Sequence, residues 1–289
     1  MKVANQMEVV VLKVKLKYFL HTISPIYLVQ VGLIKHSSDT WVAQEGFTCI
    51  DSDSNPVPTS TCAFGPAQFN PADSPTFELL ANHTLNTTYG GGAFVWGPAG
   101  FDTVSVGSIT VSGQEIGVPD MTFWEGDGTS EGILGLAFPA LTAVDLENGT
   151  ALVKDPYSPF FLSAIAQKTV TNPLHTLTPF SLFLCPRPTK IRRICTRSLR
   201  PHLGCIAFGG IVPVAVTSKS ATVPVQRYDP QKVDPSSGPN ATFLWYALDV
   251  DGYTFPGSTA VVTKSNSTMV DSGTTINLLP TAVADAYNA

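Results

Sequence analysis

Apolar and polar residues alternate along much of this chain, which is the pattern of β-strands with one buried face. The clearest case is 103–118, where two alternating runs flank Gly107 and predict a hairpin with a tight glycine turn. Shorter runs that alternate, or that are rich in β-branched and aromatic residues, are typical of strands as well. These further predicted strands lie at 11–18, 26–31, 180–184, 206–208, 222–225, 243–250 and 259–262.

Helical spacing of apolar residues is limited to 158–168 and 281–287. The composition agrees with this, because Gly 23 and Pro 23 against 13% charged residues favour short strands and turns over long surface helices. The 289 residues, 44% of them hydrophobic, are enough for one large β domain or two lobes. The sequence therefore predicts an all-β fold with two small helices, and an exposed connection at 229–240.

Charge is unevenly distributed around a net value of −5. Of the 17 Lys and Arg residues, five lie in 1–36 and six in 185–205, so six remain for the other 232 residues, which hold 21 of the 22 acidic residues. We expect no nucleic acid partner for such an acidic body, because phosphate binding needs a coherent basic face. The distribution suits a protein that works at low pH, where protonated carboxyl groups no longer repel one another.

Five Asn-x-Ser/Thr acceptors predict N-glycosylation and an extracellular or secretory location. Lys13, Lys15 and Lys17 interrupt the apolar run that a signal peptide needs, so no clean signal peptide is recognised. Residues 18–34 contain a His and a Pro and are too short to predict a membrane span. The acceptors are Asn82, Asn86, Asn148, Asn240 and Asn266.

Cysteine usage predicts one disulfide and no metal site. Cys49 and Cys62 lie in a Ser/Pro/Asn-rich stretch, where a bond between them would close a surface loop. The other three, Cys185, Cys195 and Cys205, fall in the basic segment and fit no zinc or redox spacing.

The five histidines offer no Ser-His-Asp arrangement, because no orienting acid lies near any of them in sequence. We interpret them as ordinary surface histidines. They are His21, His36, His83, His175 and His202.

The main chemical signal is the run Val270-Asp271-Ser272-Gly273-Thr274-Thr275. An Asp on a glycine-containing turn after an apolar strand is held rigidly, and backbone N–H groups and hydroxyls can bond its oxygens. Two such turns facing each other would let two carboxylates share a proton, one ionised to activate water and one protonated to polarise a peptide carbonyl. This chain contains one copy of the run.

Several ordered motifs resemble the pepsin-like aspartic peptidases, especially the fungal secreted ones, over about residues 26–289. The run at 271–275 resembles the second active-site turn of that family, and Tyr89-Gly90-Gly91-Gly92 resembles the tip of its flap hairpin. Ser37-Ser38-Asp39-Thr40-Trp41-Val42 is similar to the tail of the first active-site turn. Further matches are 132–138, which resembles the segment that completes the first active-site loop, and 180–184 and 207–210, which resemble second-lobe strands.

The resemblance implies a two-lobed acid protease fold that binds an extended peptide or protein substrate between its lobes, under the Tyr89 flap. It implies an aspartic-type endopeptidase in which water, activated by an aspartate dyad, hydrolyses peptide bonds in a monomer without a metal or organic cofactor. The residues it assigns are the catalytic Asp271, the supporting turn residues Ser272, Gly273 and Thr274, the flap residues Tyr89, Gly90 and Gly92, and the first-turn residues Ser37, Ser38 and Trp41.

The first active-site turn departs from the family pattern. The family has Asp-Thr-Gly directly before its Ser-Ser pair, whereas this chain has Ile34, Lys35 and His36. Asp39 falls at a downstream position that the family does not use for catalysis. Because one carboxylate cannot fill both protonation roles, we expect this chain to be inactive although its family function is endopeptidase. The alternative is a non-catalytic pseudoprotease that binds peptides or another protein between the lobes.

The basic segment 185–205 and the end of the chain depart from the pattern as well. The family has a polar hairpin in place of 185–205, and several more strands beyond the point where this chain ends, 18 residues after Asp271. Mis-joined exons in the gene model and a diverged pseudoprotease are two interpretations. The predicted organisation is an atypical segment 1–36 with one family-like strand, an N-terminal lobe with the flap at 37–178, and a truncated C-terminal lobe at 179–289.

Overall fold

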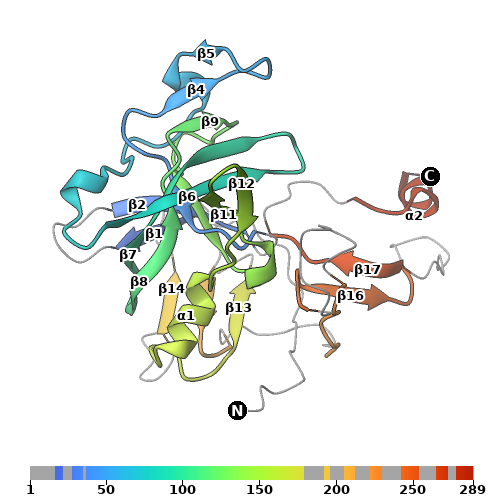
Figure 1. Ribbon diagram of the computed structural model, residues 1–289. Coiled ribbons are helices and arrows are strands. Elements are labelled where there is room, and N and C mark those ends of the chain that lie inside the picture. Colours follow the sequence, from blue (N-terminus) through green and yellow to red (C-terminus); the bar gives the residue numbers. More distant parts are fainter. Residues whose placement is uncertain are drawn as a thin grey trace.

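The structure, a computed structural model, describes residues 17–21, 28–34, 37–178, 192–195, 205–211, 222–229, 242–253, 265–272 and 278–288. Within these ranges the chain is mostly β, as the alternating pattern predicts (Figure 1). The described α-helices are α1 (Phe160–Ala166) and α2 (Thr281–Asn288), so both predicted helices are confirmed. Short 3-10 turns lie at Thr59–Thr61, Pro71–Asp73 and Pro139–Leu141.

Twelve of the described strands form one mixed sheet. They are β1 (Lys17–His21), β2 (Leu28–Ile34), β3 (Trp41–Val42), β4 (Thr48–Ile50), β5 (Pro56–Val57), β6 (Glu78–Thr88), β7 (Phe94–Val106), β8 (Ile109–Gly117), β9 (Met121–Phe123), β10 (Gly132–Gly135), β11 (Val144–Asn148) and β12 (Ala151–Lys154). The main path runs β1-β2-β10-β3-β8-β7-β6-β11-β12, with β4, β5 and β9 paired beside it. The sheet is mixed because β10 is parallel to β2, β3 to β8 and β4 to β9.

Two long hairpins form the centre of this sheet. The hairpin predicted at 103–118 is confirmed by the pairing of β7 with β8, and its turn contains Gly107 at a φ of +62°, a left-handed conformation that favours glycine. The second hairpin pairs β6 with β7 and has its tip at 89–93; we call it the flap hairpin. β7 is shared by both hairpins, so the flap is continuous with the central strands of the sheet.

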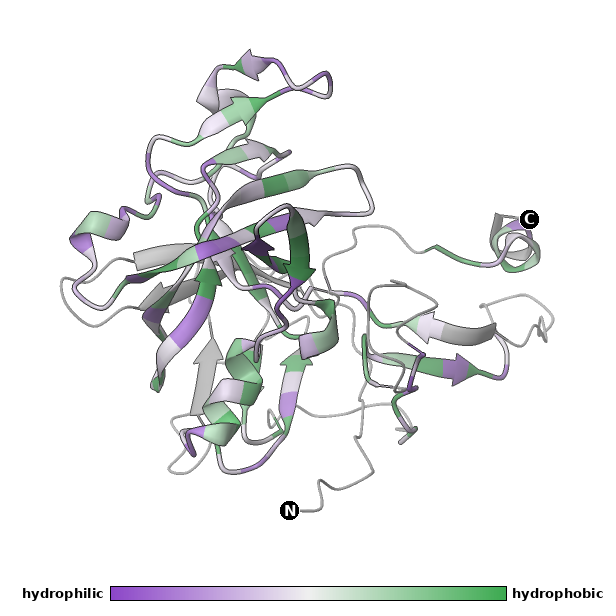
Figure 2. Cartoon of the chain, in the orientation of Figure 1, coloured by the Kyte–Doolittle hydropathy of each residue, from purple (hydrophilic) through white to green (hydrophobic). Residues whose placement is uncertain are grey.

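The largest hydrophobic core lies where α1 packs beside β8 and its neighbours. Phe160, Phe161 and Ala164 are the buried residues of α1, and Figure 2 colours part of the α1 ribbon as hydrophobic. From β8, Ile109 and Val111 enter the same core at alternate positions. The period-two pattern of the strand and the helical period of α1 therefore meet on one apolar surface.

The remaining described strands form two smaller sheets. β13 (His175–Thr178), β15 (Cys205–Phe208) and β14 (Arg192–Cys195) form an antiparallel three-stranded sheet, which confirms the strand predicted at 206–208. Ile206 and Phe208 belong to the same core cluster as α1. β16 (Ala247–Val250) pairs with β17 (Ser265–Met269) in an antiparallel hairpin.

The prediction of a strand at 222–225 is wrong. These residues form no strand, and Pro224 supplies no backbone N–H for a ladder bond. The strand predicted at 243–250 is confirmed only from Ala247 onward. The predictions at 180–184 and 259–262, most of 11–18 and most of 229–240 lie outside the described residues.

Candidate active site

The segment that leads into β3 is buried and tied to the chain that follows β10. Ser37 and Ser38 are both buried, and the Ser38 hydroxyl donates a hydrogen bond to the Phe138 carbonyl at 2.5 Å. The Ala137 N–H donates to the Ser37 carbonyl at 3.0 Å. These two bonds hold together the sequence motifs 37–42 and 132–138, which lie about a hundred residues apart in the chain.

Glycines in β10 allow this close approach. A Cβ atom on Gly132 would lie 2.0 Å from the Trp41 carbonyl oxygen, and one on Gly135 would lie 2.3 Å from the Ser38 carbonyl carbon. No side chain fits at such distances, so glycine is required at both positions. β10 thereby occupies the space between β2 and β3.

The tip of the flap hairpin places Tyr89 against Trp41. The tip is closed by hydrogen bonds from the Tyr89 N–H to the Ala93 carbonyl and from the Gly92 N–H to the Tyr89 carbonyl, with Gly92 at a φ of +86°. The Trp41 indole N–H donates to the Tyr89 hydroxyl at 2.7 Å. Burial, and then the nearby Asp39 carboxyl, raise the pKa of the Tyr89 hydroxyl, so it stays protonated.

Two aromatic residues that the sequence analysis did not select complete this cluster. Trp124 makes edge-to-face contacts with Trp41 at 5.1 Å and with Tyr89 at 5.4 Å, measured between ring centroids. Phe64 stacks on Trp124 at 6.0 Å. The flap tip thus rests on an apolar, aromatic surface.

We predict that Tyr89→Phe lowers the free energy of unfolding by about 1–2 kcal/mol, because the buried Trp41 indole N–H loses its acceptor. Urea unfolding measures this change. Tyr228→Phe is the matched control, since it removes a hydroxyl that bonds the Gln226 side chain in a half-buried position. Equal losses for the two variants would show that the Trp41–Tyr89 bond contributes nothing specific.

Asp39 is buried and bonded within the protein. Its Oδ1 accepts the Ala143 N–H at 3.0 Å and the Tyr157 hydroxyl at 3.0 Å, and that hydroxyl in turn accepts the Thr40 N–H. Burial raises the pKa of Asp39 to about 6, although both hydrogen bonds lower it. With 2% of its surface exposed, Asp39 serves as an internal acceptor that joins three segments of the lobe.

Asp271 and Ser272 follow β17 and are half-buried. The Val270 N–H donates to the Tyr246 carbonyl at 2.9 Å, which fixes the chain directly before Asp271 to the chain before β16. Asp271 therefore comes from a different sheet than Trp41 and Tyr89. Gly273 and Thr274 lie outside the described residues.

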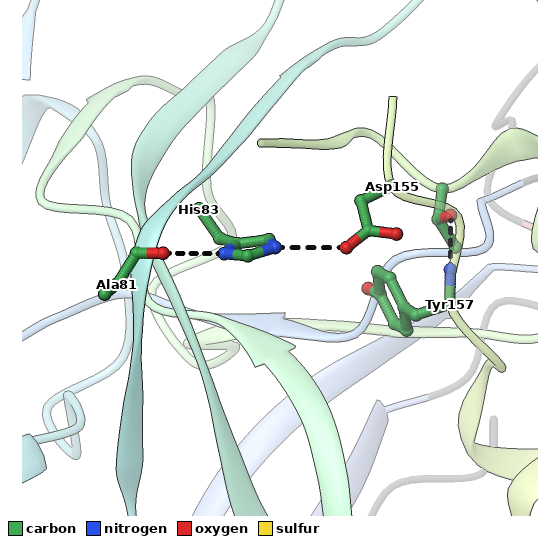
Figure 3. Close-up of polar contacts among 5 residues, drawn as sticks. Ala81, His83, Asp155 and Tyr157 are labelled. Atoms are coloured by element: carbon green, nitrogen blue, oxygen red, sulfur yellow. Dashed lines mark hydrogen bonds and ion pairs between the residues drawn. The ribbon is translucent and has the colours of Figure 1, made fainter. Parts of the chain in front are cut away.

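His83, on the flap strand β6, contacts one acidic side chain and interacts electrostatically with a second. His83 Nε2 contacts the Asp155 carboxylate at 3.0 Å, and Nδ1 contacts the Ala81 carbonyl at 2.8 Å (Figure 3). Burial opposes protonation, but these two contacts outweigh it and raise the pKa of His83. Burial, and then the Asp155 charge, raise the pKa of Glu115 to about 7. His83 thus has an acid partner 72 residues away, which the search for nearby acids missed, and both ring nitrogens are engaged.

The structure also places the predicted modification sites. Cys49 and Cys62 form the predicted disulfide. Asn82, Asn86 and Asn148 are exposed, Asn266 lies on β17 and Asn240 lies outside the described residues. Among the described residues, no group of His, Cys, Asp or Glu side chains could hold a metal ion, and no described helix is long and apolar enough to cross a membrane.

The chain is also similar in sequence to a known protein family. The model of the eukaryotic aspartyl protease family matches residues 30–289. The chain belongs to the eukaryotic aspartyl protease family. The matched residues include the 37–42 and 132–138 motifs and the flap tip, which the structure brings together as described above.

Individual aspartyl proteases are similar over most of this chain. A "Probable aspartic-type endopeptidase" from Aspergillus fumigatus is 30% identical over 88% of this chain and 52% of its own length. Rhizopuspepsin-4 from Rhizopus niveus is 27% identical over 88% of this chain and 51% of its own length. The chain therefore spans about half the length of these curated relatives.

A solved structure shows the same fold. The aspartic proteinase from Irpex lacteus matches with a TM-score of 0.62 and 20% sequence identity, over 98% of this chain and 67% of that chain. The predicted two-lobed, mostly β aspartic protease fold is thereby confirmed.

Proposed function

We propose that this chain has the substrate-binding framework of an acid endopeptidase but, with the sequence it has, binds peptides without hydrolysing them. In the family reaction, Asp271 would pair with a second aspartate, and the pair would activate water to attack the scissile carbonyl. No metal or organic cofactor takes part. The substrate would be an extended peptide or protein segment between the lobes, beneath Tyr89.

The state of Asp39 carries this proposal. It is the one aspartate in 37–42, yet it is buried and its Oδ1 accepts two internal hydrogen bonds. A carboxylate that activates water must reach that water at hydrogen-bond distance. Asp39 thus supports the lobe rather than replacing the aspartate that the family has before Ser37, where this chain has Ile34, Lys35 and His36.

In the first proposal the chain is by family an aspartic-type endopeptidase that is inactive because one aspartate is missing. The second candidate is a pseudoprotease, for which binding would itself be the function of the protein, and the flap cluster favours it. The contact of Trp41 with Tyr89, and the packing of Trp124 against both, would serve peptide binding whether or not hydrolysis follows. In this role the protein would hold a peptide or a segment of another protein in place of a substrate.

We further propose a secreted, monomeric glycoprotein. A disulfide between Cys49 and Cys62 and the exposed acceptors Asn82, Asn86 and Asn148 support a secretory route. We place the N-terminal lobe at 37–178, with Asp271, Ser272, Gly273 and Thr274 contributed by the C-terminal lobe at 179–289 and the segment 1–36 ahead of both.

Binding without turnover is the expected experimental result. We predict that titration with an extended apolar octapeptide at pH 4 changes the tryptophan fluorescence, because Trp41 and Trp124 lie beside Tyr89, while mass spectrometry detects the intact peptide only. Tyr89→Ala is expected to weaken binding by about tenfold or more, through lost aromatic contact, and Tyr228→Ala serves as its control. Cleavage of the octapeptide, or the absence of any saturable binding, would contradict the proposal.

A further inference from the structure

An exposed tryptophan lies on the flap hairpin, directly opposite a glycosylation acceptor. Trp96 of β7 is 38% exposed, one of the large hydrophobic side chains that the sheet does not bury. In the antiparallel register of β6 and β7, Trp96 pairs with Asn86. Directly opposed residues in an antiparallel pair share one face of the sheet, with Cβ atoms about 4.5–5.5 Å apart. The side chains of Asn86 and Trp96 therefore leave the backbone next to each other, on the same face of the sheet.

The backbone around Asn86 is fixed, and its side chain is outside the core. The Asn86 N–H donates to the Ala143 carbonyl at 3.1 Å, and the preceding Leu85 is fully buried on the opposite face. Asn86 and Thr88, the two essential residues of the Asn-x-Thr acceptor, are both exposed. A sugar on Asn86 thus has room outside the sheet and an apolar ring within reach.

We propose that Asn86 carries an N-linked glycan and that its first N-acetylglucosamine packs on the exposed face of Trp96. The bond forms when the Asn86 amide nitrogen attacks C1 of an oligosaccharide carried on a lipid diphosphate. The C1–N bond forms, the C1–O bond to the diphosphate breaks, the lipid diphosphate leaves and the amide proton is lost. The inference rests on the secretory route of the proposed function.

Two of the other acceptors, Asn82 and Asn148, lack such a partner, which distinguishes Asn86 from them. Asn148 pairs with Ala151 across the β11–β12 turn, so its sugar would face a methyl group. Asn82 lies within the irregular register of β6, between the pairs of Leu79 and Thr84, with a φ of +62°. Only at Asn86, among these acceptors, does the ladder place an aromatic ring directly opposite.

The position of this pair gives the glycan a structural role. Two residue pairs separate Asn86 and Trp96 from the flap tip. Thr87 pairs with Val95, and Thr88 pairs with Phe94, before the turn at Tyr89. A sugar that spans β6 and β7 at this residue pair adds contact area across the hairpin. It would therefore stabilise the hairpin that positions Tyr89.

A double-mutant cycle tests the inference on the full chain, produced in a eukaryotic secretory host. Peptide mapping by mass spectrometry gives the occupancy of each acceptor, and thermal unfolding gives Tm after the glycans are trimmed to one N-acetylglucosamine. We expect Asn86→Gln and Trp96→Ala each to lower Tm by roughly 2–4 °C, the shift of one side-chain contact in a domain of this size. The double variant is expected to lose little more than either single variant.

Matched control variants allow each outcome of the double-mutant cycle to be interpreted. Asn148→Gln combined with Trp96→Ala should be additive, Thr88→Ala should reproduce the loss of Asn86→Gln, and Trp96→Phe should keep part of the coupling. Additive losses for Asn86→Gln and Trp96→Ala, or an unoccupied Asn86 beside an occupied Asn148, would overturn the inference and leave the secretory route intact. Absence of sugar from every acceptor would overturn the secretory route as well.

Discussion

Replacing Ile34, Lys35 and His36 by Asp, Thr and Gly is expected to create peptide hydrolysis at pH 3–5, at a rate about 10²–10⁴ times that of the unaltered chain. The substitutions give the chain the Asp-Thr-Gly that its family has before the Ser-Ser pair. Ile34 ends β2 in register with Gly135 of β10, so this position is already set beside the glycine segment of the lobe. Release of fragments from a denatured protein substrate measures the effect.

Two comparisons show whether such activity comes from an aspartate pair. Adding Asp271→Asn to the triple variant should return the rate to background, and the inhibitor pepstatin should abolish it. A triple variant that folds, as judged by its unfolding transition, and yet gains no activity would show that 34–36 do not occupy the place of the first active-site turn.

The second large effect is on stability: the free energy of unfolding should rise as the pH falls from about 7 to about 4. The pKa of Asp39 is raised to about 6 in the folded protein from 3.8, so the folded state binds more protons than the unfolded state between these values. Stability is therefore lost as pH rises through this window, by about 2–3 kcal/mol for Asp39. The raised pKa values of Glu115 and His83 change the free energy of unfolding with pH in the same direction. Urea unfolding at a series of pH values measures the slope.

Asp39→Asn should remove the Asp39 share of this pH dependence. The amide oxygen can still accept the Ala143 N–H and the Tyr157 hydroxyl, but the side chain no longer ionises. Asp51→Asn is the control, because Asp51 is exposed and the Asn55 N–H lowers its pKa, which moves its titration below the window. An unchanged slope in Asp39→Asn would mean that Asp39 is not the group that couples folding to protons.

The parts of the fold that the sequence predicts are those with one buried face. β7 and β8 alternate in period two around Gly107, and α1 has helical spacing, so both are visible in the pattern. The β11–β12 hairpin was missed for a physical reason. Its Leu152 and Val153 are adjacent and both exposed, so no alternation marks it, although Asn148-Gly149 is a typical hairpin turn.

The residues of the candidate site fall into two similar groups: those that a short stretch of sequence reveals, and those that only the fold brings together. The glycine segment of β10 and the flap tip are short runs that resemble the family, so both could be recognised from a few neighbouring residues. The partners of Asp39 come from Ala143 and Tyr157, more than a hundred residues away, and only the fold brings them together. Trp124 was missed likewise, since a single tryptophan carries no local sign of what it contacts.

The most direct test compares the unaltered chain with its Asp271→Asn variant in one assay of peptide hydrolysis at pH 3–5. A chain with a single candidate catalytic aspartate should give the same background rate as the variant, while both bind the octapeptide. A rate in the unaltered chain that Asp271→Asn lowers by a hundredfold or more would contradict the account, because Asp271 would then be acting with a second carboxylate.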